Sequence, residues 1–299
     1  MSQQEEVQFE KGLSPLGVWG LALGAMIGWG CFVMPGDTLL PKAGPIGASI
    51  GLILGALMII VISFSYSYLI SKYPVAGGEF VYADTAFGKT HAFLCGWFIA
   101  IAYWSLIPMN ATAVGLVARY IFPGPLQTMP LYEIAGWTVY GGELIVDILA
   151  IIIIGIVNMR GVEAAGWFQT AVALGLVGCI LVIGAVILAG GVDWGNLQPY
   201  FAPEKTTMAS IFTVTALAPW AFVGFDCIPQ ASEEYAFSNK KTKALLVSSI
   251  SVAALMYMIM NIATAVVAPW EQYIIDNKAW PTGAAIESLV GTFGLILFA

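Results

Sequence analysis

The sequence has very few charged residues. Asp, Glu, Lys and Arg together make up 10% of its 299 residues, whereas a soluble domain carries roughly 25%. Hydrophobic residues make up 59% of the chain, and its mean hydropathy is +0.86. This composition excludes a soluble globular protein and indicates an integral membrane protein.

The residues that many enzymes and metal sites require are also scarce. The only histidine, His91, excludes a histidine-based metal site and an ordinary His-dependent catalytic triad. No phosphate-binding glycine motif is present, and no basic cluster suggests nucleic-acid binding, so we predict no enzyme activity, no cofactor and no nucleic-acid partner. The cysteines lie far apart in apolar segments, and we interpret them as small buried hydrophobic residues, not as a disulfide or metal set. They are Cys31, Cys95, Cys179 and Cys227.

Long apolar segments dominate the chain. A helix that crosses a membrane needs about 20 mostly apolar residues, and no segment alternates as the strands of a membrane barrel do. We therefore predict an all-α protein that forms a single transmembrane domain over residues 1–299. The eight predicted spans are residues 16–34, 46–70, 92–122, 144–158, 166–190, 209–231, 244–268 and 284–299.

The positive charges predict the orientation in the membrane. Lys and Arg are enriched in short cytoplasmic loops, and an N-terminus inside the cell places seven of the eleven on that side. Three of the seven form the compact cluster Lys240, Lys241 and Lys243. We therefore predict a multi-pass protein of the cytoplasmic membrane, surrounded by the lipid bilayer, with a cytoplasmic N-terminus.

The two ends of the chain carry further expectations. Residues 1–11 are polar and acidic, so we expect no signal peptide before the first span. The eighth span is still apolar at Phe298 and Ala299, and a terminus inside the bilayer would leave carbonyl groups unsatisfied. We therefore expect the chain to be the N-terminal part of a longer protein.

Two predicted spans are interrupted near their middle. The first contains Gly28 and Gly30, and the second contains Gly224 and Asp226 in the stretch 219–229, which begins and ends with proline. Irregular backbone persists in hydrocarbon only where protein encloses it or where it lines a cavity. A pair of interrupted helices is therefore the best sequence indication of a transporter's binding site.

Helix packing is the alternative interpretation of the first interruption. Gly20, Gly24 and Gly28 repeat every four residues, and this spacing of small residues lets membrane helices approach closely. Gly30 follows after one residue and leaves little helix propensity at that level. Together with the second interruption, it favours a binding site over packing alone.

Interrupted helices suit a zwitterion. A break exposes free amides that attract a carboxylate and free carbonyls that attract an ammonium group. We therefore predict that a zwitterion binds here, without a charged side chain being required. The predicted substrate-binding residues are Ile27, Gly28, Gly30, Trp104, Trp220, Ala221, Phe222, Gly224 and Asp226. Their aromatic side chains either wall the pocket or pack in the helix bundle.

Asp226 has two interpretations. An ionisable residue at membrane depth is a functional candidate by default, and burial is expected to raise its pKa. It would then carry a proton or pair with a cation. The alternative is a structural role, in which the carboxylate caps free amides of the broken helix.

Several motifs resemble the amino acid–polyamine–organocation superfamily of permeases, which has the leucine-transporter fold. The resemblance covers essentially the whole chain. The motifs are Gly24-x-x-Ile27-Gly28-x-Gly30-x-Phe32, Tyr73-Pro74 with Gly77-Gly78 and Tyr82, Asn158-x-Arg160-Gly161-Val162, and Phe222-x-Gly224-Phe225-Asp226 followed by Glu233-Glu234.

The resemblance implies two inverted five-helix repeats with discontinuous helices 1 and 6. The first repeat would cover residues 12–190, and the second, residues 205–299, would be truncated in helix 8. It also implies an amino acid permease that works by alternating access. In the family, Trp220 matches a position that can close over substrate, and Asp226 one associated with proton sensitivity.

The resemblance leaves H⁺ or Na⁺ as the coupling ion. Some proton-coupled relatives carry a lysine in helix five, whereas this sequence has no Lys or Arg between Arg160 and Lys205. Two alternatives to an amino acid permease remain: an amine or polyamine exchanger, and a transport-inactive sensor or partner subunit with the same fold.

Overall fold

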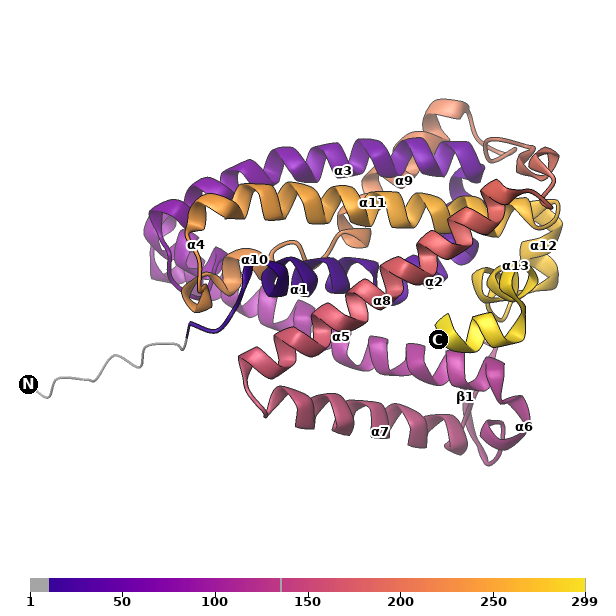
Figure 1. The fold of residues 1–299 in the computed structure, drawn as a ribbon, viewed down its shortest axis with the longest axis horizontal. Helices are drawn as coiled ribbons and strands as arrows, with labels where there is room; N and C mark the ends of the chain where they lie inside the picture. The colour runs from indigo at the N-terminus through magenta and orange to yellow at the C-terminus, as the bar shows by residue number, and fades with distance from the viewer. Residues whose placement is uncertain (1–10, 135, 299) are drawn as a thin grey trace, which may run out of the picture.

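The computed structural model describes residues 11–134 and 136–298 as a bundle of long helices (Figure 1). The long helices are α1 (Pro15–Ile27), α3 (Leu40–Lys72), α5 (Lys89–Ile121), α7 (Gly141–Asn158), α8 (Val162–Ala189), α9 (Thr207–Ala221), α11 (Thr242–Val266) and α13 (Pro281–Phe298). The short helices are α2 (Trp29–Met34), the π-helix η1 (Pro35–Leu39), α4 (Glu79–Phe87), α6 (Pro123–Leu126), η2 (Trp194–Leu197), α10 (Cys227–Gln230), η3 (Ser232–Glu234), η4 (Asn239–Lys241) and α12 (Trp270–Asp276).

The two helices that precede the interruptions begin with strong local signals. Ser14 precedes α1, and its hydroxyl accepts a hydrogen bond from the Gly17 amide at 3.1 Å. Pro15 then occupies the first helical turn, where its missing N–H costs nothing. Thr206 starts α9 in the same way, accepting from the Ala209 amide at 3.3 Å. Both starts are therefore fixed by the local sequence.

Most predicted spans are helical. Among the described residues, six helical stretches are long and apolar enough to cross a membrane. The first stretch, Pro15–Lys72, contains the first two predicted spans, which are joined through η1 and a kink at Gly44. Helix α9 is apolar but shorter, because it ends at Ala221. The chain is therefore a multi-pass membrane protein.

Residues 284–298 of the eighth predicted span fall within α13, which is long and apolar enough to cross a membrane and carries a kink. Gly291 has φ 75° and ψ 171°, so α13 consists of two shorter helices joined by a kink. Only glycine adopts such a φ readily. The first arm is buried from Pro281 to Ile286.

The prediction of an all-α protein misses a small β-hairpin. Strands β1 (Pro130–Ile134) and β2 (Trp137–Tyr140) pair antiparallel, with Glu133 opposite Thr138. These strands are rich in aromatic and branched residues, which favour extended structure. Arg119 of α5 holds the hairpin, because its guanidinium lies 4.4 Å from the Trp137 ring centre and donates to the Thr138 carbonyl at 3.1 Å.

Close glycine contacts hold the centre of the bundle together. Helix α3 packs against α9 and α11, and α1 packs against α8 and α11. A Cβ on Gly51 of α3 would lie 2.7 Å from Val214 of α9, and one on Gly55 would collide with Ala218. By contrast, α7 exposes residues 151–154, all isoleucine, to its surroundings. Such a face suits lipid.

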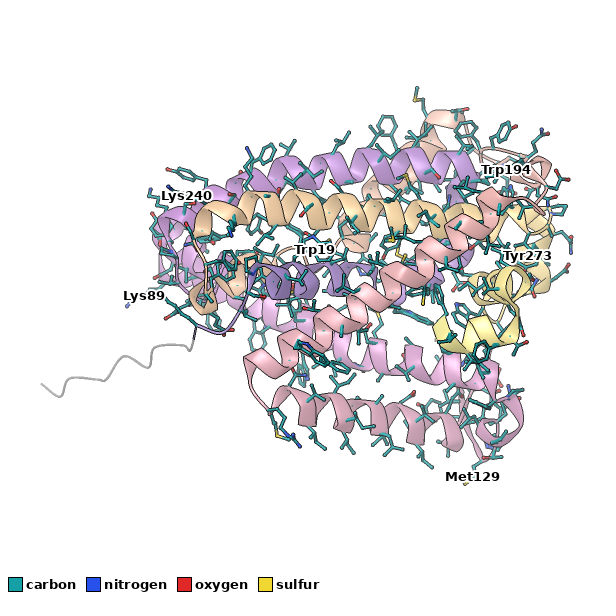
Figure 2. All side chains as sticks on the ribbon, in the orientation of Figure 1. Trp19, Lys89, Met129, Trp194, Lys240 and Tyr273 are labelled. Atoms are coloured by element: carbon teal, nitrogen blue, oxygen red, sulfur yellow. The ribbon has the colours of Figure 1, made fainter. Side chains whose placement is uncertain are left out.

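The bundle has two ends, which we name by their short helices. Helices α4 and α10 lie at one end, and α6 and α12 lie at the other (Figure 1). Figure 2 places Lys89 and Lys240 at the α4 end, and Trp194 and Tyr273 at the α12 end. Two of the positive residues that the sequence assigns to one side of the membrane therefore lie at one end.

Candidate functional site

The first interruption separates α1 from α2 at a single residue. Helix α1 ends at Ile27, Gly28 has φ −59° and ψ −144°, and α2 begins at Trp29. The last carbonyls of α1 and the first amides of α2 thus lie next to each other without a continuous helical ladder. One of these carbonyls has a partner from another helix, because the buried Tyr257 of α11 donates to the Met26 carbonyl at 3.2 Å.

The glycines of this region divide between packing and the break. A Cβ on Gly20 would lie 2.9 Å from the Thr170 backbone, and one on Gly24 would collide with Gln169, so both let α1 approach α8 closely. Gly28 meets no other helix, and its nearest atom would be 3.4 Å away, in the preceding turn. A Cβ on Gly30 would collide with the Tyr257 hydroxyl.

The second interruption spans five residues. Helix α9 ends at Ala221, residues 222–226 form consecutive turns, and the four-residue helix α10 follows. Phe222 already leaves the helical conformation, with φ −102° and ψ 14°. Gly224 has φ 116°, a backbone conformation that is strongly unfavourable for residues other than glycine.

The two interruptions touch each other. A Cβ on Gly224 would lie 3.2 Å from the carbonyl carbon of Ala25, in the last turn of α1. Phe222 is fully buried, and its ring meets the Tyr257 ring edge-on, with 6.1 Å between centroids. Tyr257 therefore contacts both interruptions, through its ring on one side and through its hydroxyl on the other.

Asp226 makes three hydrogen bonds. One carboxylate oxygen accepts from the Gly224 amide at 3.1 Å. The other accepts from the Tyr103 hydroxyl of α5 at 2.6 Å and from the Gln230 side-chain amide at 3.2 Å. The carboxylate does not cap α10. It closes the turn that precedes α10 and ties that turn to α5.

The segment after α3 joins the segment after α10. Ser232 donates to the Val75 carbonyl at 2.9 Å, and the Ala76 amide donates to the Glu233 carboxylate at 3.0 Å. Gln230 also donates to Glu79 of α4 at 3.4 Å. The Gly77-Gly78 and Glu233-Glu234 motifs, more than 150 residues apart, therefore lie together at the α4 end of the bundle.

Trp104 and Trp220 do not join this cluster. Their side chains are 75% and 51% exposed in the described structure. Neighbouring residues of a helix point about 100° apart, so Tyr103, which faces Asp226, turns Trp104 away from it. The other predicted residues lie at the two interruptions, with Ile27 and Ala221 buried at the ends of α1 and α9. The α5 residue at the site is therefore Tyr103.

The prediction of four buried cysteines holds only for Cys31. All four are free thiols, and Cys95, Cys179 and Cys227 are half-buried. Cys227 lies 3.8 Å from the Tyr103 hydroxyl, beside Asp226. It follows the second interruption directly, where the chain is too irregular to pack as a continuous helix would.

A cavity of about 210 Å³ lies at the α12 end, away from both interruptions. Its lining is Leu116, Arg119, Tyr120, Pro123, Gln127, Trp137 and Ala279. Its one charged residue, Arg119, is already paired with the buried Glu143 at 3.3 Å. We assign the candidate site to the two interruptions and not to this cavity, because the paired arginine has its counterion.

Comparisons with known proteins identify the family of the chain. The chain is 26% identical over 282 residues to the methylthioribose transporter of Bacillus subtilis (strain 168). This alignment covers 92% of the chain and 59% of that protein. It is 26% identical to the cationic amino acid transporter 4 of Mus musculus, covering 91% and 43%, and 24% identical to a branched-chain amino acid permease of Bacillus subtilis, covering 85% and 54%. The chain thus spans about half the length of these relatives. Residues 13–299 match the amino acid permease family, and the chain belongs to this family within the amino acid–polyamine–organocation superfamily.

Proposed function

We propose that the full-length protein is a secondary active transporter that moves amino acids across the cytoplasmic membrane by alternating access. The observation that carries this proposal is the contact between the two helix interruptions, where Gly224 lies directly against Ala25. Two interruptions on separate helices meet in an apolar bundle, and irregular backbone at membrane depth requires a reason. A substrate held between them supplies that reason.

The interruptions offer both kinds of group that an amino acid needs. The first amides of α2, at Trp29 and Gly30, precede any intrahelical partner and are suited to the substrate carboxylate. The last carbonyls of α1 are suited to the ammonium group. The Tyr257 hydroxyl, which already donates to Met26, orients this carbonyl end. Backbone groups would recognise the features common to amino acids, and side chains would select among them.

The proposed architecture has two inverted repeats. The first corresponds to residues 12–190 with the interruption after α1, and the second to residues 205–299 with the interruption after α9. The α4 end would face the cytoplasm, because Lys72, Lys89 and the cluster at 240–243 flank its helices. This assignment also places the N-terminus in the cytoplasm.

The α4 end supplies a closed gate for alternating access. Asp226 connects the second interruption to Tyr103 of α5 and to Gln230 of α10. Ser232 and Glu233 then hold the loop that follows α3. Release of substrate toward this end would require these contacts to separate, so alternating access would proceed by breaking and remaking them.

An amine or polyamine exchanger is the second candidate. Asp226 and Glu79 lie on one side of the second interruption, with no lysine or arginine of the described chain within 4.0 Å of either. Two carboxylates without a cation suit a substrate that carries additional positive charge. Relatives named for cationic amino acids, and a serine/threonine exchanger of Bacillus subtilis, also belong among the similar proteins.

Thermal stability of the purified full-length protein tests the proposal. A ligand at 100 times its dissociation constant stabilises by about 2.7 kcal/mol. We expect one or more amino acids to stabilise the protein and to be taken up into proteoliposomes. Stabilisation by polyamines alone would favour the exchanger. Binding without uptake would indicate a transport-inactive sensor, and neither binding nor uptake of amino acids or amines would refute the proposal.

A further inference from the structure

One side-chain amide joins two carboxylates at the α4 end. The Nε2 atom of Gln230 donates to Asp226 at 3.2 Å and to Glu79 at 3.4 Å. An amide nitrogen has two hydrogens, so each carboxylate receives one. These two hydrogen bonds of Gln230 connect α4 to the second interruption, although the two segments are separated by about 150 residues of sequence.

The surroundings of Glu79 contain acidic and hydroxyl groups and no base. Asp226 and Cys227 face it from the second interruption, Tyr66 faces it from α3, and Cys95 from α5. No lysine or arginine in the described part of the chain lies within 4.0 Å of Glu79 or Asp226. A second negative charge next to Asp226 therefore has no counterion, and a partly buried charge without a partner is costly.

Two buried oxygen atoms here have no hydrogen-bond partner. They are the Oε1 atom of Glu79 and the hydroxyl of Tyr82, whose side chain is only 9% exposed. Burial, and next the charge of Glu79, raises the pKa of Tyr82 to about 12, so the hydroxyl lies within the field of this carboxylate. Buried polar atoms are nearly always paired, and a protonated Oε1 of Glu79 would gain a hydrogen that it can donate.

We propose that Glu79 is a proton-binding site, which is protonated while the α4 end is closed and which releases its proton to water when that end opens. The proposal rests on the proposed function, because a closed and an open state are part of it. Protonation converts the Glu79 carboxylate to a carboxylic acid, removes one of two adjacent negative charges and gives its unpartnered oxygen a hydrogen to donate. Asp226 keeps its structural role in the turn, since all three of its donors remain in place.

The pH dependence of the closed state follows from the direction in which the pKa of Glu79 is shifted. Burial first, and then the charge of Asp226, raises the pKa of Glu79 above its ordinary value of 4.5. A carboxyl with a raised pKa in the closed state stabilises that state fully below the ordinary pKa. This stabilisation is lost as the pH rises through the raised pKa. Acid should therefore favour the closed α4 end, and higher pH should favour opening.

Infrared spectroscopy of the full-length protein in lipid tests the proposal directly. A protonated carboxyl has a carbonyl stretch that a carboxylate lacks, so titration reveals each carboxyl and its midpoint. We expect a band in the parent protein with a midpoint above pH 4.5. It should be absent from Glu79→Gln, and in Asp226→Asn it should persist with a lower midpoint because the neighbouring charge is gone. Asp84→Asn, an exposed carboxyl of the same helix, should leave the band unchanged.

Each other outcome overturns the proposal. A band that survives in Glu79→Gln and disappears in Asp226→Asn would place the proton on Asp226. The absence of any carboxyl band with a raised midpoint in the parent protein would mean that neither group is protonated. If Glu79→Gln does not fold, Glu79→Asp tests the assignment instead. The carbonyl band of a carboxyl at residue 79 must then shift, whereas the band of any other carboxyl stays where it is. Amino acid binding is measured separately, so a titrating Glu79 in a protein that binds no amino acid would refute only the transport function.

Discussion

One added methyl group at residue 30 tests how the first interruption is held. In the structure, a Cβ on Gly30 would collide with the hydroxyl of Tyr257, which donates to the Met26 carbonyl at 3.2 Å. Gly175 of α8 provides the matched control, because a Cβ there meets no atom within 4 Å. Gly30→Ala and Gly175→Ala therefore add the same group to a membrane helix, in a crowded place and in an open one.

The expected cost of Gly30→Ala has two parts. Forcing an extra methyl group into a packed site costs about 1–3 kcal/mol. Displacing the Tyr257 hydroxyl also weakens its hydrogen bond to Met26, which contributes about 1 kcal/mol. The packing strain is present with and without ligand, so it lowers the stability of the protein and not its affinity. Because the hydrogen bond orients the carbonyl end where we propose that the ammonium group binds, losing its contribution of about 1 kcal/mol would weaken binding roughly fivefold. Gly175→Ala should change binding by roughly twofold at most.

The assay is isothermal titration of the best amino acid ligand into the purified full-length protein. The decisive variant is the double substitution Gly30→Ala/Tyr257→Phe. Without the hydroxyl, the atoms nearest to the new methyl group would be Met34 Sδ and the ring of residue 257, both at about 3.5 Å, an ordinary contact distance. We expect the double variant to bind no worse than Tyr257→Phe alone, with a coupling energy of about 1 kcal/mol. Additive losses would refute the proposed collision, and unimpaired binding by Gly30→Ala would remove Gly30 from the site.

Three further predictions concern other parts of the chain. Arg119→Met should destabilise the protein by about 3–5 kcal/mol because it leaves the buried Glu143 without its partner, whereas Arg119→Met/Glu143→Met should recover most of this loss in thermal unfolding. Trp280→Phe should cost about 1–3 kcal/mol in the same measurement, since the indole N–H donates to the buried Phe32 carbonyl at 2.8 Å; an unchanged unfolding temperature would contradict this. Trp104→Ala should change ligand affinity by roughly twofold at most, because the side chain is 75% exposed, and a larger loss in titration would return Trp104 to the site.

The interruptions could be predicted from the sequence because they depend on local properties. Gly28 and Gly30 lower helix propensity within one span, and Gly224 requires a left-handed backbone. Both features are visible in a short window of residues. The position of Asp226 beside the second interruption is equally local. Whether Asp226 caps a helix or closes a turn cannot be predicted from local sequence, because this depends on the donors from Tyr103 and Gln230.

The partners of these groups could not be predicted in the same way. Tyr257 lies more than 220 residues after Gly28, and no local signal distinguishes it from other aromatic residues of a membrane helix. The choice between Tyr103 and Trp104 depends on how α5 is rotated about its axis, which its neighbours determine. Glu79 directly follows the Gly77-Gly78 motif in the sequence, but its contact with Gln230 arises only when the α4 end folds together.

The difference between local features and distant partners also explains where the observed fold departs from the predicted one. Residues 130–140 contain no strong alternation, and their hairpin is held by Arg119 from α5. The eighth span is mostly apolar, so its composition predicts a helix. Gly291 adopts a positive φ and kinks this helix, which the composition of the span does not indicate.

The location of a bound amino acid tests the central claim most directly. A cryo-electron microscopy structure of the full-length protein with its tightest-binding amino acid would show this location. We predict that the ligand lies between the two interruptions, with its carboxylate within hydrogen-bond distance of the Trp29 and Gly30 amides and its ammonium group near the last carbonyls of α1. A ligand bound elsewhere, with no contact to residues 27–30 or 222–226, would contradict the account.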